Sequence, residues 1–308
     1  MEWPRWTPEE RMARLTPPPI SGGKIAMVLD TDTYNEVYDQ FALAYSLLSP
    51  ERLDVRAVYA APFLNDRSTG AGDGMEKSYA EIVRLLAALG RSAEGFAHRG
   101  SGSFLPDERT PVRSAAAEDL VDRASRMGEE PLYVVAIGAI TNVASALLLD
   151  PSITRKIVVV WLGGQPLHAP DTREFNLSQD VAAARVVLDS GVPMVLVPCT
   201  GVASHMLTTV PELRQEIAGK NAICDALFSL FCAYNADHFA WAKEIWDVSA
   251  VGYVINPEWV PTVLQPAPVP AYDSRWSLDP RRHLIRVAQH ANRNAIFADM
   301  FRKLAAGQ

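Results

Sequence analysis

The sequence predicts a single α/β domain, built as an open and mostly parallel sheet with helices on both faces. Short apolar runs alternate with helical patterns almost to the end of the chain, which is typical of a parallel sheet with crossover helices. Most of these runs are apolar at every position, as strands covered by helices on both sides must be. A chain of 308 residues with 48% hydrophobic content can bury a full-sized core.

The elements follow in order along the chain. Residues 1–23 are expected to form an irregular N-terminal arm, and residues 24–308 one domain. Strands are expected at 24–30, 53–59, 132–137, 157–162 and 193–198. Helices are expected at about 38–48, 76–90, 114–127, 140–149, 179–190, 211–231 and 282–306. The last of these keeps its apolar residues near one side, and the proline-rich stretch 256–280 is expected to loop over the surface.

Charge and composition exclude several classes of partner. The formal net charge is −7, and the sequence has no run of basic residues of the kind that binds a phosphate backbone. Polymeric nucleic acid is therefore not expected to bind. No apolar run reaches the ~18 residues of a membrane span, and the N-terminal stretch carries charges and prolines where a secretory signal has an apolar core. A cytoplasmic protein without a membrane partner is therefore expected.

An acidic loop follows the first predicted strand. Asp30 and Asp32 stand where that strand ends, and Glu36 and Asp39 come soon after. In an open α/β sheet, ligands bind beyond the carboxyl ends of the strands. Carboxylates that gather there repel one another unless a cation lies between them, and Ca²⁺ accepts six to eight oxygen ligands in irregular geometry. The alternative is a solvated acidic turn whose aspartates cap helices.

The same loop carries a resemblance to a known family. The segments 28–32, Val-Leu-Asp-Thr-Asp, and 39–44, Asp-Gln-Phe-Ala-Leu-Ala, resemble the N-terminal signature of the inosine-uridine preferring nucleoside hydrolases, Asp-x-Asp-Pro-Gly-x-Asp-Asp. Thr33-Tyr34 replaces the Pro-Gly pair, the loop is two residues longer, and Tyr38 stands where the first of the paired aspartates would be. The chain therefore resembles a divergent member of the family.

Further segments match the family in the same order. They are Pro62 to Asn65 after the second predicted strand, the stretch from Val135 to Asn142, Gly163-Gly164 followed by Glu174-Phe-Asn176, and Trp246-Asp247 where many members have His-Asp. The resemblance implies the family's fold over residues 24–308 as a catalytic domain. It also implies a homo-oligomer, either a dimer or a tetramer.

The resemblance implies a Ca²⁺ ion and a ribonucleoside as ligands. Asp32, Asp39, Asp247 and the backbone carbonyl of Ile137 would ligate the ion, with Asp30 supporting them from behind. Asp32 would also be the catalytic base that takes a proton from a metal-bound water. The 2′- and 3′-hydroxyls of ribose would occupy the open positions on calcium.

The remaining ribose hydroxyls would be held by Asn65, Glu174 and Asn176. A 2′-deoxynucleoside is therefore expected to bind poorly, since it would leave buried polar groups unpaired. Tyr38 and Trp246 would line the substrate site, with Trp246 stacking on the base. As an ordinary packing aromatic, Trp246 would instead have no such role.

Two departures from the family pattern leave the chemistry open. Indole cannot donate the proton that a histidine would, so either His168 or His238 could replace it; Lys77 could also approach the pocket or simply be an exposed helix residue. At the position of Tyr38 a carboxylate is missing, for which Asn35 or Glu36, brought in by the longer loop, could substitute.

The sequence thus predicts calcium-dependent hydrolysis of the N-glycosidic bond of ribonucleosides to ribose and free base, in purine or pyrimidine salvage. One alternative keeps the fold as a nucleoside- or ribose-binding protein without catalysis. A remote alternative treats the Asp30-Thr-Asp32-Thr33 segment as the nucleophile motif of a haloacid dehalogenase-type phosphatase. That enzyme would need Mg²⁺, a downstream lysine and a late acidic pair, and this set does not occur in order.

Overall fold

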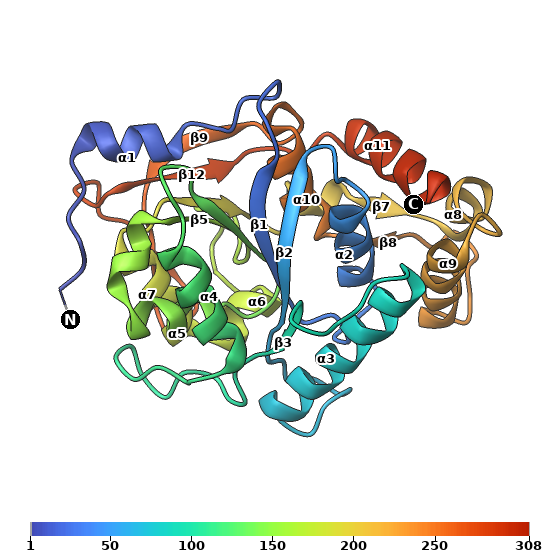
Figure 1. Ribbon diagram of the computed structural model, residues 1–308, viewed down its shortest axis with the longest axis horizontal. Coiled ribbons are helices and arrows are strands. Elements are labelled where there is room, and N and C mark those ends of the chain that lie inside the picture. The colour runs from blue at the N-terminus through green and yellow to red at the C-terminus, as the bar shows by residue number, and fades with distance from the viewer. Residues whose placement is uncertain (1, 308) are drawn as a thin grey trace.

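The computed structural model describes residues 2–307. Its main sheet contains the strands β1 (Ile25–Thr31), β2 (Leu53–Ala60), β3 (Ala97–Arg99), β4 (Leu132–Ala136), β5 (Ile157–Leu162), β6 (Met194–Val197), β9 (Thr262–Pro266) and β12 (Leu284–Ala288). They are ordered β3-β2-β1-β4-β5-β6-β12-β9 (Figure 1). All neighbours pair in parallel except β12 and β9, which are antiparallel. The predicted fold class, an open and mostly parallel α/β sheet, is confirmed.

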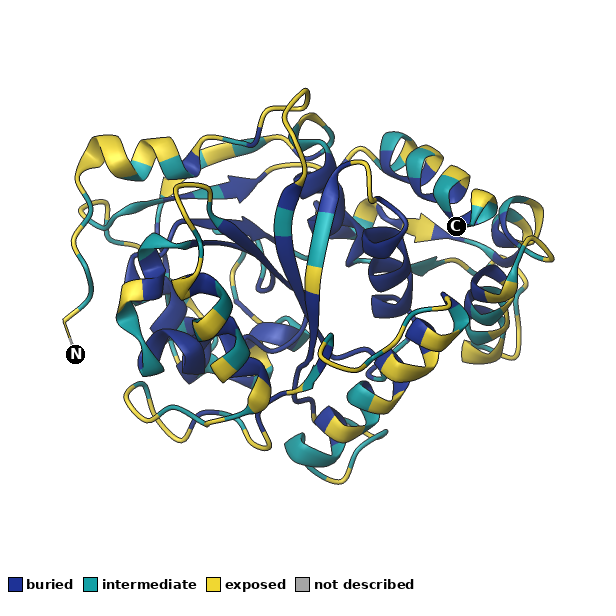
Figure 2. Cartoon of the chain, viewed as in Figure 1, coloured by how far each residue is buried: buried dark blue, intermediate teal, exposed yellow. Residues whose placement is uncertain are grey.

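Helices cover the sheet on both sides (Figure 1). One hydrophobic cluster packs α4 (Ala115–Ser125), α5 (Thr141–Leu149) and α7 (Val181–Ser190) against one face. A second cluster packs helices against the opposite face, namely α2 (Asp39–Leu47), α3 (Ala71–Ala88), α8 (Val210–Glu216), α9 (Ala222–Tyr234), α10 (Val248–Ile255) and α11 (Arg293–Ala306). The central strands and α2 are almost entirely buried, as Figure 2 shows.

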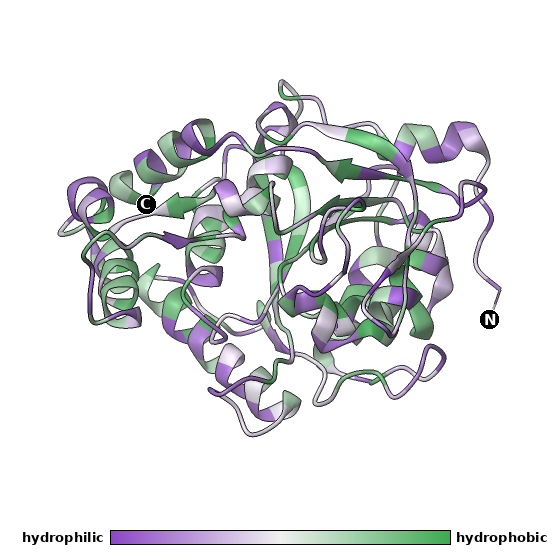
Figure 3. Cartoon of the chain, turned by 180° about the vertical axis from the view of Figure 1, so that it is seen from behind, coloured by the Kyte–Doolittle hydropathy of each residue, from purple (hydrophilic) through white to green (hydrophobic). Residues whose placement is uncertain are grey.

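The apolar strand residues predict this burial. Every residue of β4 and β5 is buried, whereas the outer helices alternate between buried and exposed positions. Seen from behind, these helices alternate between hydrophobic and hydrophilic residues (Figure 3). Small elements complete the chain: α1 (Pro8–Leu15), α6 (Phe175–Gln179), and two short pairs, β7 (Leu207–Thr208) with β8 (Lys243–Glu244) and β10 (Val269–Pro270) with β11 (Trp276–Ser277).

Several predicted boundaries were wrong. The N-terminal arm is not irregular throughout, because Thr7 and Glu10 form a reciprocal capping box that starts α1. The expected helix at 282–306 begins only at Arg293; residues 284–288 form β12, in which Ile285 and Val287 face the core. The apolar residues of this segment are spaced so that they also fit a helix, whereas in the strand every second side chain faces the core.

Two other regions differ from the predictions. The expected helix at 211–231 is two helices, α8 and α9, because Gly219 takes a left-handed conformation at φ +73° and Asn221 caps the second helix. The proline-rich stretch 256–280 contains β9, an edge strand, where prolines are tolerated.

Candidate active site

Four aspartates meet the carboxyl end of the sheet from three elements. β1 ends with Asp30 and Thr31, and the next residue is Asp32. Asp39 is the first residue of α2, and Asp247 is the residue before α10. All four aspartate side chains have no solvent exposure. A helix N-terminus favours a negative charge, which explains why Asp39 and Asp247 are tolerated where they lie.

Most carboxyl oxygens of Asp32, Asp39 and Asp247 accept no hydrogen bond in the described part of the chain. Within residues 2–307, neither oxygen of Asp32 or Asp247 has one, and Oδ2 of Asp39 also lacks one. Oδ1 of Asp39 accepts a bond of 2.5 Å from the hydroxyl of Thr31. Buried acceptors are almost always satisfied in native proteins, so these orphaned oxygens point to a missing positive partner.

The pKa values of these groups are consistent with that reading. Burial raises the pKa of Asp32 well above its usual range, and the nearby charge of Asp39 raises it further. Burial, followed by the charges of Asp39 and Asp32, does the same to the pKa of Asp247. Burial also raises the pKa of Asp39, to about 7, while its bond from Thr31 opposes the rise. The three carboxyls are therefore electrostatic neighbours in a dry site.

The donor chemistry fits a hard cation. Among the described residues, no three acidic, histidine or cysteine side chains are gathered closely enough to form a complete metal cluster by themselves. The orphaned oxygens of Asp32, Asp39 and Asp247 and a backbone carbonyl are the ligand types that Ca²⁺ prefers.

Asp30 is held behind this group by a buried amide. Asn142 donates from Nδ2 to Oδ1 of Asp30 at 2.7 Å and to the carbonyl of Ala60 at 3.1 Å. The Oδ1 atom of Asn142 accepts from the backbone and hydroxyl of Ser101. Burial raises the pKa of Asp30 to about 7, and the bond from Asn142 lowers it. The sequence pattern places Asn142 only at the end of a segment that matches the family, and it does not predict this contact with Asp30.

Ile137 follows β4 and lies beside the end of β1. Its amide donates to the carbonyl of Asp30 at 2.8 Å, which ties the end of β4 to the end of β1. The next residue, Gly138, packs closely against Asp32, because an added Cβ would lie 3.0 Å from both Cγ and Oδ1 of Asp32 and would push that side chain aside. Gly138 therefore lets the two strand ends approach, a role that the sequence motif alone did not reveal.

The Glu-Phe-Asn segment starts α6. The Glu174 carboxylate accepts from the amides of Gly164, Asn176 and Leu177 at 2.7–3.0 Å. The Nδ2 atom of Asn176 donates to the carbonyls of Ile137 and Leu162, both at 3.0 Å. Both side chains are thus fixed by the backbone, and their remaining lone pairs are free for hydroxyl groups.

The longer loop brings Asn35, Asn65 and Tyr38 into one chain of hydrogen bonds. Nδ2 of Asn65 donates to Oδ1 of Asn35 at 2.7 Å, and Nδ2 of Asn35 donates to the hydroxyl of Tyr38 at 3.3 Å. Burial, then the charge of Glu36, raises the pKa of Tyr38. Tyr38 is therefore a neutral, buried member of the site, and Asn35 reaches it from the loop.

Glu36 points elsewhere. Its Oε2 accepts from the hydroxyl of Tyr234 at 2.8 Å and lies 2.7 Å from Nζ of Lys243. Lys243 lies on β8, and its Nζ is 5.1 Å from the ring centroid of Tyr38 and 5.7 Å from that of Trp246. Sequence reasoning missed Lys243; its only signal was its position four residues before Asp247.

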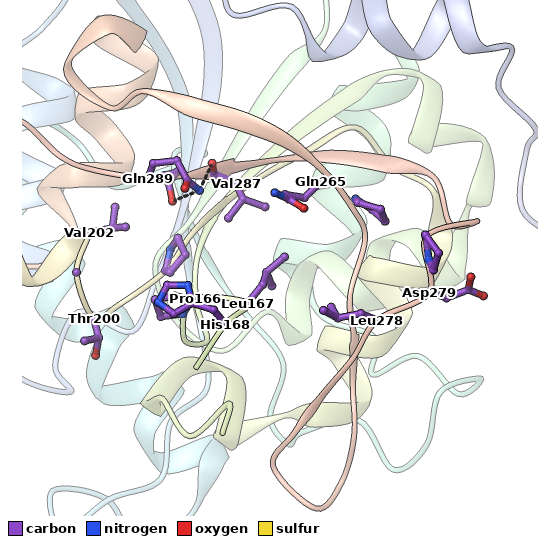
Figure 4. Close-up of a pocket in the computed structure, with 15 residues that line it drawn as sticks. Pro166, Leu167, His168, Thr200, Val202, Gln265, Leu278, Asp279, Val287 and Gln289 are labelled. Atoms are coloured by element: carbon purple, nitrogen blue, oxygen red, sulfur yellow. Dashed lines mark hydrogen bonds between the residues drawn. The ribbon is translucent and has the colours of Figure 1, made fainter. Parts of the chain in front are cut away.

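The other candidate acids have neighbours other than the four aspartates. His168 lines an apolar cavity of about 580 Å³, together with residues such as Leu167, Thr200 and Gln289 (Figure 4). None of the four aspartates lines that cavity. His238 contacts the carbonyl of Cys232 at 3.0 Å. Lys77 donates to the carbonyl of Arg67 and to Asp73, both at 2.8 Å.

Relatives with known names are similar to most of this chain. The chain is 27% identical over 267 residues to a pyrimidine-specific ribonucleoside hydrolase RihA of Klebsiella pneumoniae (strain 342), covering 78% of this chain and 82% of that protein. A RihA of Escherichia coli O1:K1 / APEC is 26% identical over the same length.

Solved structures share the fold. A plant nucleoside hydrolase, PpNRh1, superposes with a TM-score of 0.72 at 18% identity, covering 92% of this chain and 99% of that one. A purine-preferring ribonucleoside hydrolase from Gardnerella vaginalis superposes with a TM-score of 0.68 at 20% identity, covering 91% and 98%.

No helix in the described part of the chain is both long and apolar enough to cross a membrane.

The model of one family, described as inosine-uridine preferring nucleoside hydrolase, matches residues 27–298. That match spans both the acidic loop at the end of β1 and the distant Asp247, the two ends of the site. The chain therefore belongs to the nucleoside hydrolases, a family of enzymes that hydrolyse N-glycosidic bonds.

Proposed function

We propose that this protein hydrolyses the N-glycosidic bond of ribonucleosides in a calcium-dependent reaction, with Asp32 as the base. The observation that carries the proposal is the group of buried carboxyl oxygens without donors on Asp32, Asp39 and Asp247. Those residues and the Ile137 carbonyl would hold Ca²⁺. When bound, the ion polarises water and ribose hydroxyls.

Asp32 has the environment of a general base. Its two oxygens are free of donors in the described chain, so they can accept a proton from the attacking water. Asp30 is held at Oδ1 by Asn142, whereas its Oδ2 has no donor within residues 2–307, and we assign it a supporting role. The proton from water goes to Asp32, the oxygen bonds to C1′, and the electron pair of the C1′–N bond leaves with the base.

Ribose recognition follows from the fixed polar groups. Asn65, Glu174 and Asn176 are each held by other groups of the chain, which lowers the entropy lost when they bind hydroxyls. We expect kcat/KM for 2′-deoxyuridine to be at least about a hundredfold below that for uridine, because a missing hydroxyl leaves desolvated polar groups unpaired.

Base preference is tested directly. The sequence relatives carry the name pyrimidine-specific, and a structural neighbour carries the name purine-preferring. Uridine, cytidine, inosine and guanosine should therefore be compared by release of reducing sugar, each with Ca²⁺ and with EDTA. Sugar release that needs Ca²⁺ supports the proposal.

Other outcomes discriminate the alternatives. Nucleoside binding by calorimetry without sugar release would favour a binding protein of the same fold. Hydrolysis of p-nitrophenyl phosphate with Mg²⁺ would instead favour a phosphatase. A dimer or tetramer, a cytoplasmic location and a role in nucleoside salvage remain predictions beside this proposal; light scattering tests the first.

A further inference from the structure

The side chain of Lys243 lies in a cage of three aromatic rings and one carboxylate. Its side chain is 13% exposed, and Nζ lies 2.7 Å from Oε2 of Glu36. The ring centroids of Tyr38, Tyr234 and Trp246 lie 5.1, 5.3 and 5.7 Å from Nζ. Such distances allow the ring faces to attract an ammonium group. The cage therefore fixes a positive charge at one place.

Two of the cage rings belong to residues next to the proposed metal ligands in the sequence. Tyr38 directly precedes Asp39, and Trp246 directly precedes Asp247. The charges of Asp247, Asp32 and Asp39 all reach Tyr38 and raise its pKa, although burial and Glu36 raise it more. Lys243 thus contacts both rings that adjoin the proposed metal ligands.

The departing base needs a proton donor or a cation. When the C1′–N bond breaks, the base departs with an electron pair and negative charge, which a proton donor or cation stabilises. The hydroxyl of Tyr38 already accepts from Asn35, and the indole of Trp246 is no acid. Arg67 donates to the carbonyls of Asn35 and Glu36, but a guanidinium keeps its protons.

The cage leaves Lys243 with donors to spare. An ammonium group has three N–H donors, and the contact with Glu36 uses one. Glu36 is in turn fixed by the hydroxyl of Tyr234 at 2.8 Å. The orientation of the ammonium is therefore set by the chain before any ligand arrives.

We propose that Lys243 donates a hydrogen bond and then a proton to the departing nucleobase, and that Glu36 is the residue that positions it. The ligand class is a ribonucleoside whose base offers a carbonyl oxygen or a two-coordinate ring nitrogen. The electron pair of the C1′–N bond moves onto the base, the base takes a proton from Nζ, and solvent returns that proton to the amine. This inference rests on the proposed function.

The test compares two kinds of leaving group. p-Nitrophenyl β-D-ribofuranoside releases a stable phenolate that needs no protonation, whereas uridine and inosine release poor leaving groups. Lys243→Gln should lower kcat on the nucleosides by about 10² to 10⁴-fold, and on the nitrophenyl riboside by less than about threefold. Lys243→Arg keeps the charge without the proton donor and should recover binding more than kcat.

Lys303→Gln is the matched control. Lys303 is 15% exposed, pairs with Glu51 and Asp299 at 2.7 Å, and lies 5.3 Å from the ring centroid of Tyr45. It is on α11, and removing its charge should leave both activities near the wild-type values. This control measures the general cost of losing a caged lysine.

The outcomes separate cleanly. Equal losses on both substrates for Lys243→Gln and Lys243→Arg, or unchanged activity on nucleosides, would overturn the role of Lys243 while leaving the hydrolase proposal intact. A wild-type protein that cleaves neither substrate would overturn the proposed function, and this inference with it. If Lys243→Gln does not fold by circular dichroism, Lys243→Arg gives the deciding kcat ratio.

Discussion

The Nδ2 atom of Asn176 donates to the carbonyl oxygen of Ile137 at 3.0 Å. A carbonyl has two lone pairs, so this bond can orient Ile137 while leaving the second pair for a cation. We expect Asn176→Ala to weaken Ca²⁺ binding by about 10 to 100-fold, as happens when a group that orients a ligand is removed. Calorimetric titration with Ca²⁺ measures the affinity. An unchanged affinity would remove Ile137 from the ligand set.

Asp32→Asn separates catalysis from folding. The amide cannot accept the proton of water, so kcat should fall by about 10² to 10⁴-fold. The metal-free protein should become more stable at pH 8, by about 1 kcal/mol, since an amide donor then reaches carboxyl oxygens such as Oδ2 of Asp39 that had none. Urea unfolding with EDTA measures this. A less stable metal-free variant would contradict the view that these oxygens lack partners.

The stability of the metal-free protein should depend on pH. The pKa of Asp39 rises from 3.8 to about 7 in the folded chain, so between these values the folded state holds a proton that the unfolded state has lost. This contribution is fully present below pH 3.8, and it is lost as pH rises through about 7. A bound cation favours the ionised form, so the stabilisation by Ca²⁺ should grow from pH 5 to pH 8.

Thermal unfolding with Ca²⁺ and with EDTA across that range measures the difference. His283 acts in the opposite direction, because burial lowers its pKa from 6.5 to about 4. It is present in both conditions and cancels in the difference. A stabilisation by Ca²⁺ that shrank with rising pH would contradict the assignment of these carboxylates.

The structure reverses the effect on turnover that the family pattern predicts for Tyr38→Asp. Judged by the family pattern alone, Tyr38→Asp would restore a missing carboxylate and raise turnover. In the structure Tyr38 is 8% exposed, accepts from Asn35, and lies under Lys243. A carboxylate there would add charge to a dry acidic site. We therefore expect Tyr38→Asp to lower kcat/KM, and Tyr38→Phe to cost only about 1 kcal/mol of stability.

Steady-state kinetics on uridine and inosine, with urea unfolding of each variant, measure both effects. A gain of activity in Tyr38→Asp would mean that Tyr38 merely fills the position of the lost aspartate.

The parts of the fold that sequence could predict are those with strong periodicity. The strands β4, β5 and β6 are continuous apolar runs, and their burial on both sides follows from that composition. β1 and β2 are apolar enough to be predicted as strands, although β2 has polar residues at its more exposed positions. β12 could not be separated from a helix, because five residues with mixed spacing fit both periods. β3, of three residues, is too short to carry a signal.

The site was predicted where neighbours in sequence are neighbours in space. Asp30, Asp32 and Asp39 lie close together in the sequence, and the resemblance to a family adds Asp247 to them as a prediction. Lys243 and Asn142 were missed because their partners, Glu36 and Asp30, lie far away along the chain. The packing of β8 and α5 in the fold brings these pairs together, and no local sequence pattern predicts such contacts.

The late position of Asp247 has a consequence for how the protein matures. Asp32 and Asp39 emerge early in synthesis, whereas Asp247 follows almost all of the parallel strands. A nascent chain therefore holds only part of the proposed ligand set until α10 has docked beside α2. Calcium would then act on the finished fold, slowing its unfolding rather than guiding its formation, and chains truncated before α10 should gain no protection from the ion against proteolysis.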